Sequence, residues 1–354
     1  MKITQIDYWA EEVKLKVPYR TAEEYIEKSD IVFIKAETDK GISGIGCTSP
    51  DKNITRESPE EVISKIGQFI EPLLYNSDPF RYIHILESIK KIIGKSPATL
   101  CLVDVLLYDL LAKSANIPLY KLLGGYRERI TTSVTIGIIP LEETIEKTKE
   151  LISRGFNIIK LKGGLNVDED IEKVNKIREI FGTELIIRFD ANQGYSVNDA
   201  IKFMSETRRA GLELFEQPTP RDKFDWLGII TRKTDVPVIA DESLMDLKDA
   251  YNLSKNELTD LINIKLVKVG GITEALHINS TAKAAGIEAM VGCLDECALG
   301  ISAGMHFALS RPNIAYADLD GHLDLENDPT KDAVVIKNGN LYPNEEPGLG
   351  FSFD

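Results

Sequence analysis

The sequence predicts an α/β protein in which a parallel (β/α)8-type barrel follows a separate α+β domain. From about residue 130 onward, eight short runs rich in aliphatic and β-branched residues alternate with amphipathic stretches of helical periodicity. Between residues 162 and 318, consecutive runs end 24 to 28 residues apart, which is the spacing of successive strand-and-helix units in a barrel. An open doubly wound sheet uses the same alternation, but the chain lacks the glycine-rich phosphate fingerprint of that fold, so the barrel is favoured.

The first part of the chain has a different pattern, which predicts a separate domain. Residues 1–50 alternate apolar and polar side chains, and the turn sequence Asp39-Lys40-Gly41 joins two such runs, as in an antiparallel hairpin. Residues 58–115 have helical periodicity and open with Ser58 and Glu61, the spacing of a capping box. Strands followed by helices, without alternation between them, indicate an α+β domain.

We place the N-terminal domain at residues 1–125 and the barrel at residues 126–320. The tail, residues 321–354, is rich in Asp, Pro and Gly and holds no further barrel unit, so we expect it to rejoin the N-terminal domain. A chain of 354 residues is long enough to form both a full barrel and a modest additional domain.

Composition and charge exclude several classes of function. The net charge is −14 and no basic stripe interrupts the acidic surplus, so neither nucleic acid nor an anionic membrane is an expected partner. No apolar run approaches the roughly 20 residues that span a bilayer, and the N-terminal segment lacks the pattern of a signal peptide, which predicts a cytoplasmic protein. The four cysteines are scattered and are expected to be free thiols.

Charged residues stand at the carboxyl ends of five consecutive predicted strands, where a buried parallel strand should be apolar. They are Lys160 and Lys162, then Asp190, Glu216, Asp241 and Lys265. The three acidic side chains would converge at one mouth of the barrel and repel one another unless a cation neutralised them. Oxygen ligands without His or Cys select a hard metal ion, so we predict one Mg²⁺, replaceable by Mn²⁺, on Asp190, Glu216 and Asp241.

The lysines predict proton transfer at this metal site. Lys160 and Lys162 are two residues apart and point to the same side of their strand, into the mouth. Lys265 lies four strands further round, roughly opposite Lys162, so a substrate between them would meet an amine on each face. One lysine could remove an α-proton while the other delivers one from the opposite side, with Mg²⁺ stabilising the enediolate of the adjoining carboxylate. A binding protein without turnover would need no such pair.

These residues resemble the enolase superfamily, and within it the muconate-lactonizing-enzyme subgroup, along nearly the whole chain. The similarity lies in the Lys-x-Lys, Asp, Glu, Asp and Lys series and in the stretches DANQGY, FEQP, ADES, INIKLVKVGG and MVGC. The resemblance implies a modified (β/α)7β barrel, closed by a capping domain that sets specificity, in a homo-oligomer. It also implies a substrate site lined by Thr135, Lys160, Cys293 and Asp295, with Lys160 near the substrate carboxylate.

The last predicted strand narrows the choice among possible reactions, because it ends in Asp318-Leu319-Asp320. This pattern is similar to the Asp-x-Asp with which dipeptide epimerases hold the free α-ammonium of their substrate, whereas muconate and o-succinylbenzoate offer no cation there. The resemblance therefore implies a dipeptide epimerase that inverts the α-carbon of the C-terminal residue. An N-acylamino acid racemase or an o-succinylbenzoate synthase is the alternative, in which the two aspartates would only begin an acidic loop.

The side chain of the second substrate residue is a separate question. The L-Ala-D/L-Glu epimerases of this family place an arginine on a loop of the capping domain to bind the Glu side chain. In this sequence Glu24 aligns at that position, and Asp295 replaces a residue that is commonly apolar. Both acids disfavour an acidic second side chain. A basic or a hydrophobic or aromatic side chain is therefore predicted, with L-Ala-D/L-Glu epimerase as the alternative.

Overall fold

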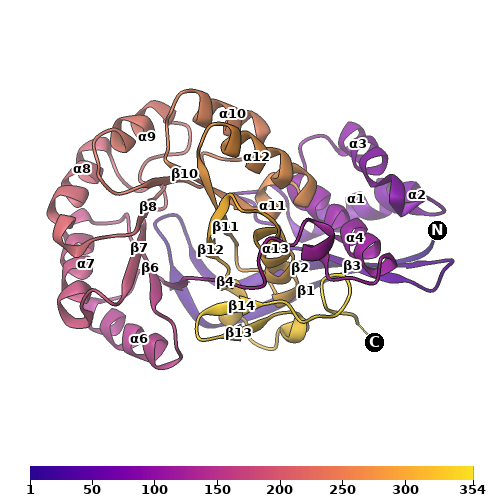
Figure 1. Ribbon diagram of the computed structural model, residues 1–354, viewed down its shortest axis with the longest axis horizontal. Coiled ribbons are helices and arrows are strands. Elements are labelled where there is room, and N and C mark those ends of the chain that lie inside the picture. Colours follow the sequence, from indigo (N-terminus) through magenta and orange to yellow (C-terminus); the bar gives the residue numbers. More distant parts are fainter. Residues whose placement is uncertain (354) are drawn as a thin grey trace.

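Eight parallel strands form a nearly closed barrel in the structure, a computed structural model that describes residues 1–353 (Figure 1). The strands are β5 (Val134–Ile136), β6 (Ile158–Lys162), β7 (Ile186–Asp190), β8 (Leu214–Glu216), β9 (Val238–Ala240), β10 (Leu261–Lys265), β11 (Glu288–Gly292) and β12 (Ile314–Asp318). Their order in the sheet follows their order in the chain. The predicted barrel is therefore confirmed, and within the described residues β5 and β12 meet at a seam without a regular hydrogen-bond ladder.

The barrel helices lie outside the strands and form a ring around them (Figure 1). They are α6 (Leu141–Ser153), α7 (Val167–Phe181), α8 (Val197–Glu206), α9 (Phe224–Thr231), α10 (Leu247–Lys255), α12 (Ile272–Ala284) and α13 (Ala298–Ser310), with the short α11 (Leu266–Val269) directly after β10. The side chains of Asn166, Ser196 and Asp246 accept hydrogen bonds from the first turns of α7, α8 and α10 and so fix where these helices begin. Because each helix crosses back outside the sheet, the carboxyl ends of all the strands share one mouth.

The N-terminal part of the chain forms an antiparallel sheet covered by helices. Its strands are β1 (Ile3–Arg20), β2 (Tyr25–Thr38) and β3 (Ser43–Thr48), and its helices include α1 (Pro59–Lys65), α2 (Glu71–Leu74), α3 (Tyr82–Ile93), α4 (Pro97–Ser114) and α5 (Leu119–Leu122). The predicted hairpin joins β2 to β3, and the predicted capping box is present at α1, where Ser58 and Glu61 bond reciprocally. Gly46 lets α4 approach β3 closely, because a Cβ atom there would lie 2.2 Å from the Leu102 carbonyl oxygen.

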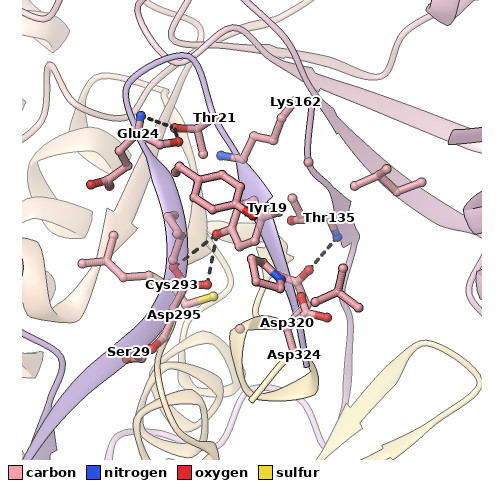
Figure 2. A pocket seen from close by; sticks show the side chains of 18 of the residues that line it. Tyr19, Thr21, Glu24, Ser29, Thr135, Lys162, Cys293, Asp295, Asp320 and Asp324 are labelled. Atoms are coloured by element: carbon pink, nitrogen blue, oxygen red, sulfur yellow. Dashed lines mark hydrogen bonds between the residues drawn. The ribbon is translucent and has the colours of Figure 1, made fainter. Parts of the chain in front are cut away.

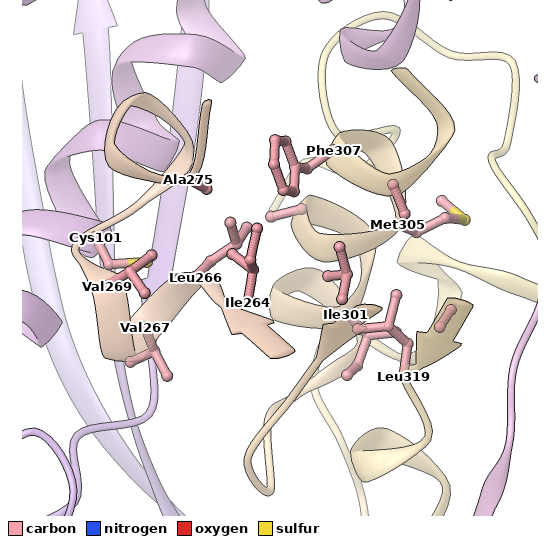
Figure 3. Close-up of a cluster of buried hydrophobic side chains, with 14 of the residues drawn as sticks. Cys101, Ile264, Leu266, Val267, Val269, Ala275, Ile301, Met305, Phe307 and Leu319 are labelled. Carbon is pink, nitrogen blue, oxygen red and sulfur yellow. The ribbon is translucent and has the colours of Figure 1, made fainter. Parts of the chain in front are cut away.

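One part of the hydrophobic core joins the second half of the barrel to helix α4 (Figure 3). Ile264 of β10, Leu266 of α11 and Ile301 of α13 belong to the same buried apolar cluster as Cys101 of α4. None of these side chains is more than 3 % exposed. Burying an aliphatic side chain stabilises a fold by roughly 1.5–3 kcal/mol. The strand ends of the mouth are therefore held by a packed core that includes the N-terminal domain.

The C-terminal tail contacts both parts of the chain. Strands β13 (Val335–Lys337) and β14 (Asn340–Tyr342) form a hairpin, and β14 pairs with β4 (Ile130–Thr131) beside the barrel. Further on, the Leu349 backbone NH donates to Asp109 of α4, and the Phe353 ring centroid lies 5.2 Å from that of Trp9 in β1. The tail thus reaches the N-terminal sheet and helices, while the domain boundaries at residues 125 and 320 stay a prediction.

The end of the β1–β2 hairpin lies over the barrel mouth. The Ile138 backbone NH, just after β5, donates to the Arg20 carbonyl oxygen at 2.8 Å. Gly137 permits this approach, because a Cβ atom there would lie 2.8 Å from the Cβ of Tyr19. Residues 21–24, which we call the lid loop, are thereby held above the carboxyl ends of the strands.

Helix α13 carries a histidine whose protonation opposes folding. The His306 side chain is fully buried, and its Nδ1 accepts a hydrogen bond of 3.1 Å from the Tyr120 backbone NH. Burial lowers the pKa of His306 from 6.5 to about 3, so between these pH values the unfolded chain binds a proton that the folded chain does not. Stability should therefore fall as the pH drops below 6.5.

We predict that His306→Asn, which keeps an acceptor near the position of Nδ1, reduces this acid sensitivity. Between pH 7.5 and 5 the wild type should lose about 2 kcal/mol more unfolding free energy than the variant, because pH 5 lies about 1.5 units below the pKa in the unfolded chain. Urea unfolding at the two pH values measures the difference. Equal losses in both proteins would refute this role of His306.

Candidate active site

Three carboxylates converge at the mouth of the barrel, as the sequence predicted. Asp190 ends β7, Glu216 ends β8 and Asp241 directly follows β9. One carboxylate oxygen from each of the three residues lies within 4.8 Å of the others, and we call this group the carboxylate cluster. All three residues are buried, at 2 % exposure or less. In the part of the chain that the structure describes, no other group of Asp, Glu, His or Cys side chains has this arrangement.

The surroundings of the carboxylate cluster fit a hard divalent cation. Burial, together with the negative charges of Asp190 and Asp241, raises the pKa of Glu216 to about 7 against the attraction of Lys160. Asn263 Nδ2 donates to Glu216 Oε1 at 2.6 Å and so fixes the orientation of that carboxylate. A divalent cation would remove the mutual repulsion of the acids, and a donor set of oxygens alone is typical of Mg²⁺ or Mn²⁺ sites.

Two lysines approach the carboxylate cluster from opposite strands. Lys162 ends β6, and its Nζ donates to Asp190 Oδ2 at 2.7 Å. Lys265 ends β10, four strands away in the sheet, and its Nζ forms an ion pair of 2.8 Å with Asp241 Oδ2. Both lysines are largely buried and line one cavity, into which Figure 2 shows Lys162 projecting. The structure thus places an amine on each side of the mouth.

Lys160 connects the carboxylate cluster to the last strand. Its Nζ forms an ion pair with Asp318, which ends β12, and lies 3.6 Å from Glu216 Oε2 and 3.8 Å from Asp190 Oδ2. Burial alone would raise the pKa of Asp318, but the charge of Lys160 outweighs burial and lowers this pKa to about 2. Asp318 is therefore held as a carboxylate next to the centre of the site.

Asp320, the second residue of the Asp-x-Asp sequence, lines the same cavity as Asp318. Its Oδ2 accepts a hydrogen bond of 2.6 Å from the Thr135 backbone NH of β5, which Figure 2 shows. Burial and the neighbouring charge of Asp318 raise the pKa of Asp320 to about 7. The Cys293 thiol donates to the Asp318 carbonyl oxygen at 3.3 Å. The structure therefore brings Thr135 and Cys293 to the two aspartates.

The lid loop and β1 close the cavity from the side of the N-terminal domain (Figure 2). Tyr19 OH lies 3.0 and 3.2 Å from the two carboxylate oxygens of Asp295, which follows β11, and donates a hydrogen bond to them. Glu24 lies on the lid loop, where its backbone NH donates to Thr21 and its Oε2 accepts a hydrogen bond of 3.0 Å from Asn53. Both acids line the cavity, and each already accepts a hydrogen bond from another residue of the protein.

These side chains surround a cavity of about 750 Å³ with a strongly acidic lining. Thirteen carboxylate side chains and five lysines line it. Three of the five lysines are Lys160, Lys162 and Lys265, each of which already pairs with a buried carboxylate. The remaining surface is therefore negative, and such a cavity favours a ligand that carries positive charge.

Sequence reasoning missed several residues that shape this site, among them Asn263, Lys268 and Tyr19. Lys268 Nζ donates to Asp241 Oδ1 at 2.5 Å, and its only signal was a charge three residues after Lys265 in an otherwise apolar stretch. Tyr19 gave no signal, because its partner Asp295 lies 276 residues away in the chain. The strand pattern brings the ends of β9 and β10 together but does not show which lysine contacts Asp241, and it does not relate Tyr19 to Asp295 at all.

Two family models match the chain. The N-terminal domain model of mandelate racemase and muconate lactonizing enzyme matches residues 3–124, and the enolase C-terminal domain-like model matches residues 143–354. The chain belongs to the enolase superfamily. The family resemblance that the charged strand ends predicted is thereby confirmed.

Known members of the enolase superfamily resemble this chain over its full length. The L-Lys-D/L-Arg epimerase of Desulforapulum autotrophicum is 38 % identical over 99 % of both chains. The solved substrate-liganded L-Ala-D/L-Glu epimerase from Bacillus subtilis has a TM-score of 0.96 at 33 % identity, covering 99 % of this chain and 98 % of that one. The dipeptide epimerase from Enterococcus faecalis V583, complexed with Mg and L-Leu-L-Tyr, has a TM-score of 0.95 at 36 % identity over 100 % of both chains.

We predict that this superfamily member binds Mg²⁺ or Mn²⁺ through the carboxylate cluster. Glu216→Gln removes one of the three negative charges, so the affinity for Mn²⁺ should fall by about 100-fold or more. Isothermal titration with MnCl₂ measures the affinity.

The matched control for this titration is Glu296→Gln. Glu296 is also buried, and burial raises its pKa to about 7, but the residue lies outside the carboxylate cluster. Its replacement should leave the Mn²⁺ affinity within about twofold of the wild type, because no ligand is lost. Equal affinities of the two variants would contradict the assignment of the metal site.

Proposed function

We propose that the protein is a dipeptide epimerase, which inverts the α-carbon of the C-terminal residue of its substrate. The observation that carries this function is the pair Lys162 and Lys265, which line one cavity from opposite strands beside the carboxylate cluster. Binding alone needs no such pair, whereas removal of a proton from one face and its return to the other needs one base on each face. The full-length relatives named as dipeptide epimerases support the same reaction.

The substrate carboxylate is expected to bind at the carboxylate cluster. Asp190, Glu216 and Asp241 would hold a divalent cation there, whose positive charge would attract this group and favour loss of the neighbouring α-proton. The magnesium in the solved E. faecalis complex supports this choice of ion. Lys160 lies between the cluster and Asp318, so its ammonium adds positive charge at the same end of the substrate.

The two lysines exchange protons with the α-carbon. On one face, the neutral amine of one lysine takes the α-proton, and the electron pair of the broken C–H bond spreads into the adjacent carboxylate. On the other face, the ammonium of the second lysine donates a proton to the same carbon, and the new C–H bond has the opposite configuration. Lys162 and Lys265 exchange roles in the reverse direction, so epimerisation in both directions needs no third base.

The free amino group of a dipeptide matches the two aspartates at the seam. Asp318 and Asp320 both line the cavity, next to Lys160, and offer two carboxylates to an α-ammonium. Asp318 already pairs with Lys160, but an N-acylated amino acid brings no positive charge to this position, so the second buried acid, Asp320, would gain no cationic partner from it, which is unfavourable. We therefore favour dipeptides with a free amino group over N-acylamino acids.

The acidic lining of the cavity supports a basic second side chain. Glu24 on the lid loop and Asp295 after β11 both line the cavity near the lid, and burial raises the pKa of Asp295 to about 6. A lysine or arginine side chain would pair with these acids, whereas a glutamate side chain would meet like charges. A hydrophobic or aromatic second residue is the alternative, since Tyr19, Ile26 and Ile54 also line the cavity.

A small dipeptide is the partner that this site supports. Among the described residues, no helix is both long enough and apolar enough to cross a membrane. The homo-oligomeric state, the cytoplasmic location and the absence of a nucleic-acid partner stay predictions from the sequence.

We predict that each lysine removes the α-proton from only one epimer of the substrate. In Lys162→Ala and in Lys265→Ala, epimerisation should fall by about 100-fold or more, because one of the two proton transfers loses its base. Each variant should still exchange the α-proton of one epimer with solvent, and the two variants should prefer opposite epimers. Proton NMR of each epimer in D₂O measures the exchange.

The control for the lysine variants is Lys121→Ala, an exposed lysine that pairs with Glu345 outside the site. It should epimerise as fast as the wild type. Exchange of both epimers by Lys162→Ala or by Lys265→Ala would contradict the assignment of one base to each face.

We predict that Glu24 contributes to the choice of the second side chain. When the wild type is tested with a dipeptide library, turnover should be highest with Lys or Arg at the second position. Glu24→Gln should raise the KM for those substrates by about tenfold, because a charge-assisted contact is lost. The same variant should leave the KM for a dipeptide with Leu at this position nearly unchanged. Proton NMR in D₂O follows every substrate in parallel.

The control for this library is Glu128→Gln, which removes one exposed carboxylate that does not line the cavity. Its KM values should match those of the wild type. Preferential turnover of L-Ala-L-Glu by the wild type would show that the proposed preference is wrong.

A further inference from the structure

The barrel has one seam, and the two aspartates of the proposed ammonium site lie on it. β5 and β12 are the two ends of the eight-stranded sheet, and among the described residues only an isolated bridge between Thr132 and Ala317 joins them. One backbone bond, from the Ser133 NH to the Ala317 carbonyl oxygen at 3.2 Å, accompanies that bridge. The seam therefore leaves polar groups that a regular ladder would have paired.

Side chains from both edges fill the seam. Asp318 Oδ1 accepts a hydrogen bond of 2.6 Å from the Ser133 hydroxyl, and Asp320 Oδ2 accepts one of 2.6 Å from the Thr135 backbone NH. Directly after Asp318, the Leu319 backbone NH donates to Thr132 Oγ1 at 2.8 Å. Each aspartate is thus attached to the β5 edge through one oxygen. For Asp318 that attachment is the hydrogen bond from the Ser133 hydroxyl.

The direction of the Ser133 hydroxyl is set by Arg188. Arg188 lies on β7 two residues before Asp190, so it points into the barrel one layer below the mouth. Its Nη1 donates to Ser133 Oγ at 3.0 Å and to the Ala317 carbonyl oxygen at 2.8 Å, while its Nε pairs with Glu213 at 2.7 Å. Because a guanidinium can only donate, the single hydroxyl proton of Ser133 is directed away from Arg188. Of the two acceptors on the other side, Asp318 Oδ1 at 2.6 Å is much nearer than the Ala317 carbonyl oxygen at 3.5 Å, so the proton goes to Asp318.

The opposite side of Asp318 carries the charged contacts of the site. Lys160 Nζ forms an ion pair with Asp318 Oδ2, whereas Ser133 bonds to Oδ1. Ser133 is fully buried and does not line the cavity, so it cannot touch a substrate itself. An effect of Ser133 on substrate binding must therefore pass through the orientation of the Asp318 carboxylate.

We propose that Ser133, with its hydroxyl oriented by Arg188, is a positioning residue that fixes the Asp318 carboxylate for the α-ammonium of the substrate. The inference rests on the proposed function, because it assumes that a free amino group binds at Asp318 and Asp320. Holding Oδ1 on the seam keeps Oδ2 turned toward the cavity and Lys160 before the substrate arrives. Without the hydroxyl, the Asp318 carboxylate rotates about its Cβ–Cγ bond. Fixing its orientation then lowers the binding free energy that the substrate ammonium gains.

Steady-state kinetics of Ser133→Ala with a free-amino dipeptide tests this proposal. The KM should rise by about tenfold, because a hydrogen bond to a charged acceptor is lost, and kcat should stay within about threefold of the wild type. An unchanged KM would overturn the proposal, and so would a fall in kcat without a change in KM. Should Ser133→Ala not fold, Ser133→Cys replaces it with the same expectation, since a thiol is a weak donor.

A matched control separates positioning from general loss of stability. Ser302 on α13 is also fully buried and its hydroxyl donates one hydrogen bond, of 2.8 Å, to the Leu349 carbonyl oxygen. Ser302→Ala should lower the Tm about as much as Ser133→Ala but leave KM unchanged. A tenfold rise of KM in Ser302→Ala would overturn the specific role of Ser133.

The pair of variants at Ser133 and Asp318 gives a second test. In an Asp318→Asn background the acceptor is neutral, so adding Ser133→Ala should raise KM, or the dissociation constant measured by calorimetry, by less than about threefold. A further tenfold rise there would show that Ser133 acts independently of Asp318 and would refute the proposal. Failure of the proposed function is distinct, because the wild type itself would then exchange no α-proton of any dipeptide in D₂O.

Discussion

The convergence of three acids in a buried mouth is the constraint on which the rest of the site depends. One oxygen of each acid in the carboxylate cluster lies within 4.8 Å of the others, and such a group is stable only beside positive charge. Lys162, Lys265 and Lys268 each pair with a member of the cluster, and Lys160 lies 3.6 Å from Glu216. The lysines proposed to move the substrate proton are therefore also residues that balance the acids proposed to hold the metal.

The barrel delivers these groups to one place because its strands are parallel. A charge at the carboxyl end of any strand reaches the same mouth, whatever its distance along the chain. The seam between β5 and β12 is the exception to the regular ladder, and there the side chains of Ser133, Asp318 and Asp320 replace backbone pairing. The irregular part of the barrel is thus the part that faces the amino group of the proposed substrate.

Chemistry and specificity lie on different parts of this fold. The groups proposed for proton transfer end strands of the barrel and are fixed by its packed core. The groups proposed to select the second side chain lie on the lid loop and on the loop after β11, where Tyr19 links the N-terminal sheet to Asp295. Members of one superfamily can keep the first set and change the second, because loop residues are replaced at little cost to the core.

The sequence by itself determined the barrel, the carboxylate cluster and the two opposed lysines. Regular spacing of strand ends is sufficient for these predictions. Parallel strands bring their carboxyl ends together whatever conformation the loops adopt. Only the tertiary structure decided that Lys160 pairs with Asp318, that Tyr19 bonds to Asp295, and that Arg188 orients Ser133. The strand periodicity brings Lys160 and Asp318 to one mouth but does not pair them, because that pairing depends on how the seam closes. The other two contacts depend on the seam and on how the N-terminal hairpin packs over the mouth. Local sequence patterns do not predict such packing, because it depends on contacts between residues far apart in the chain.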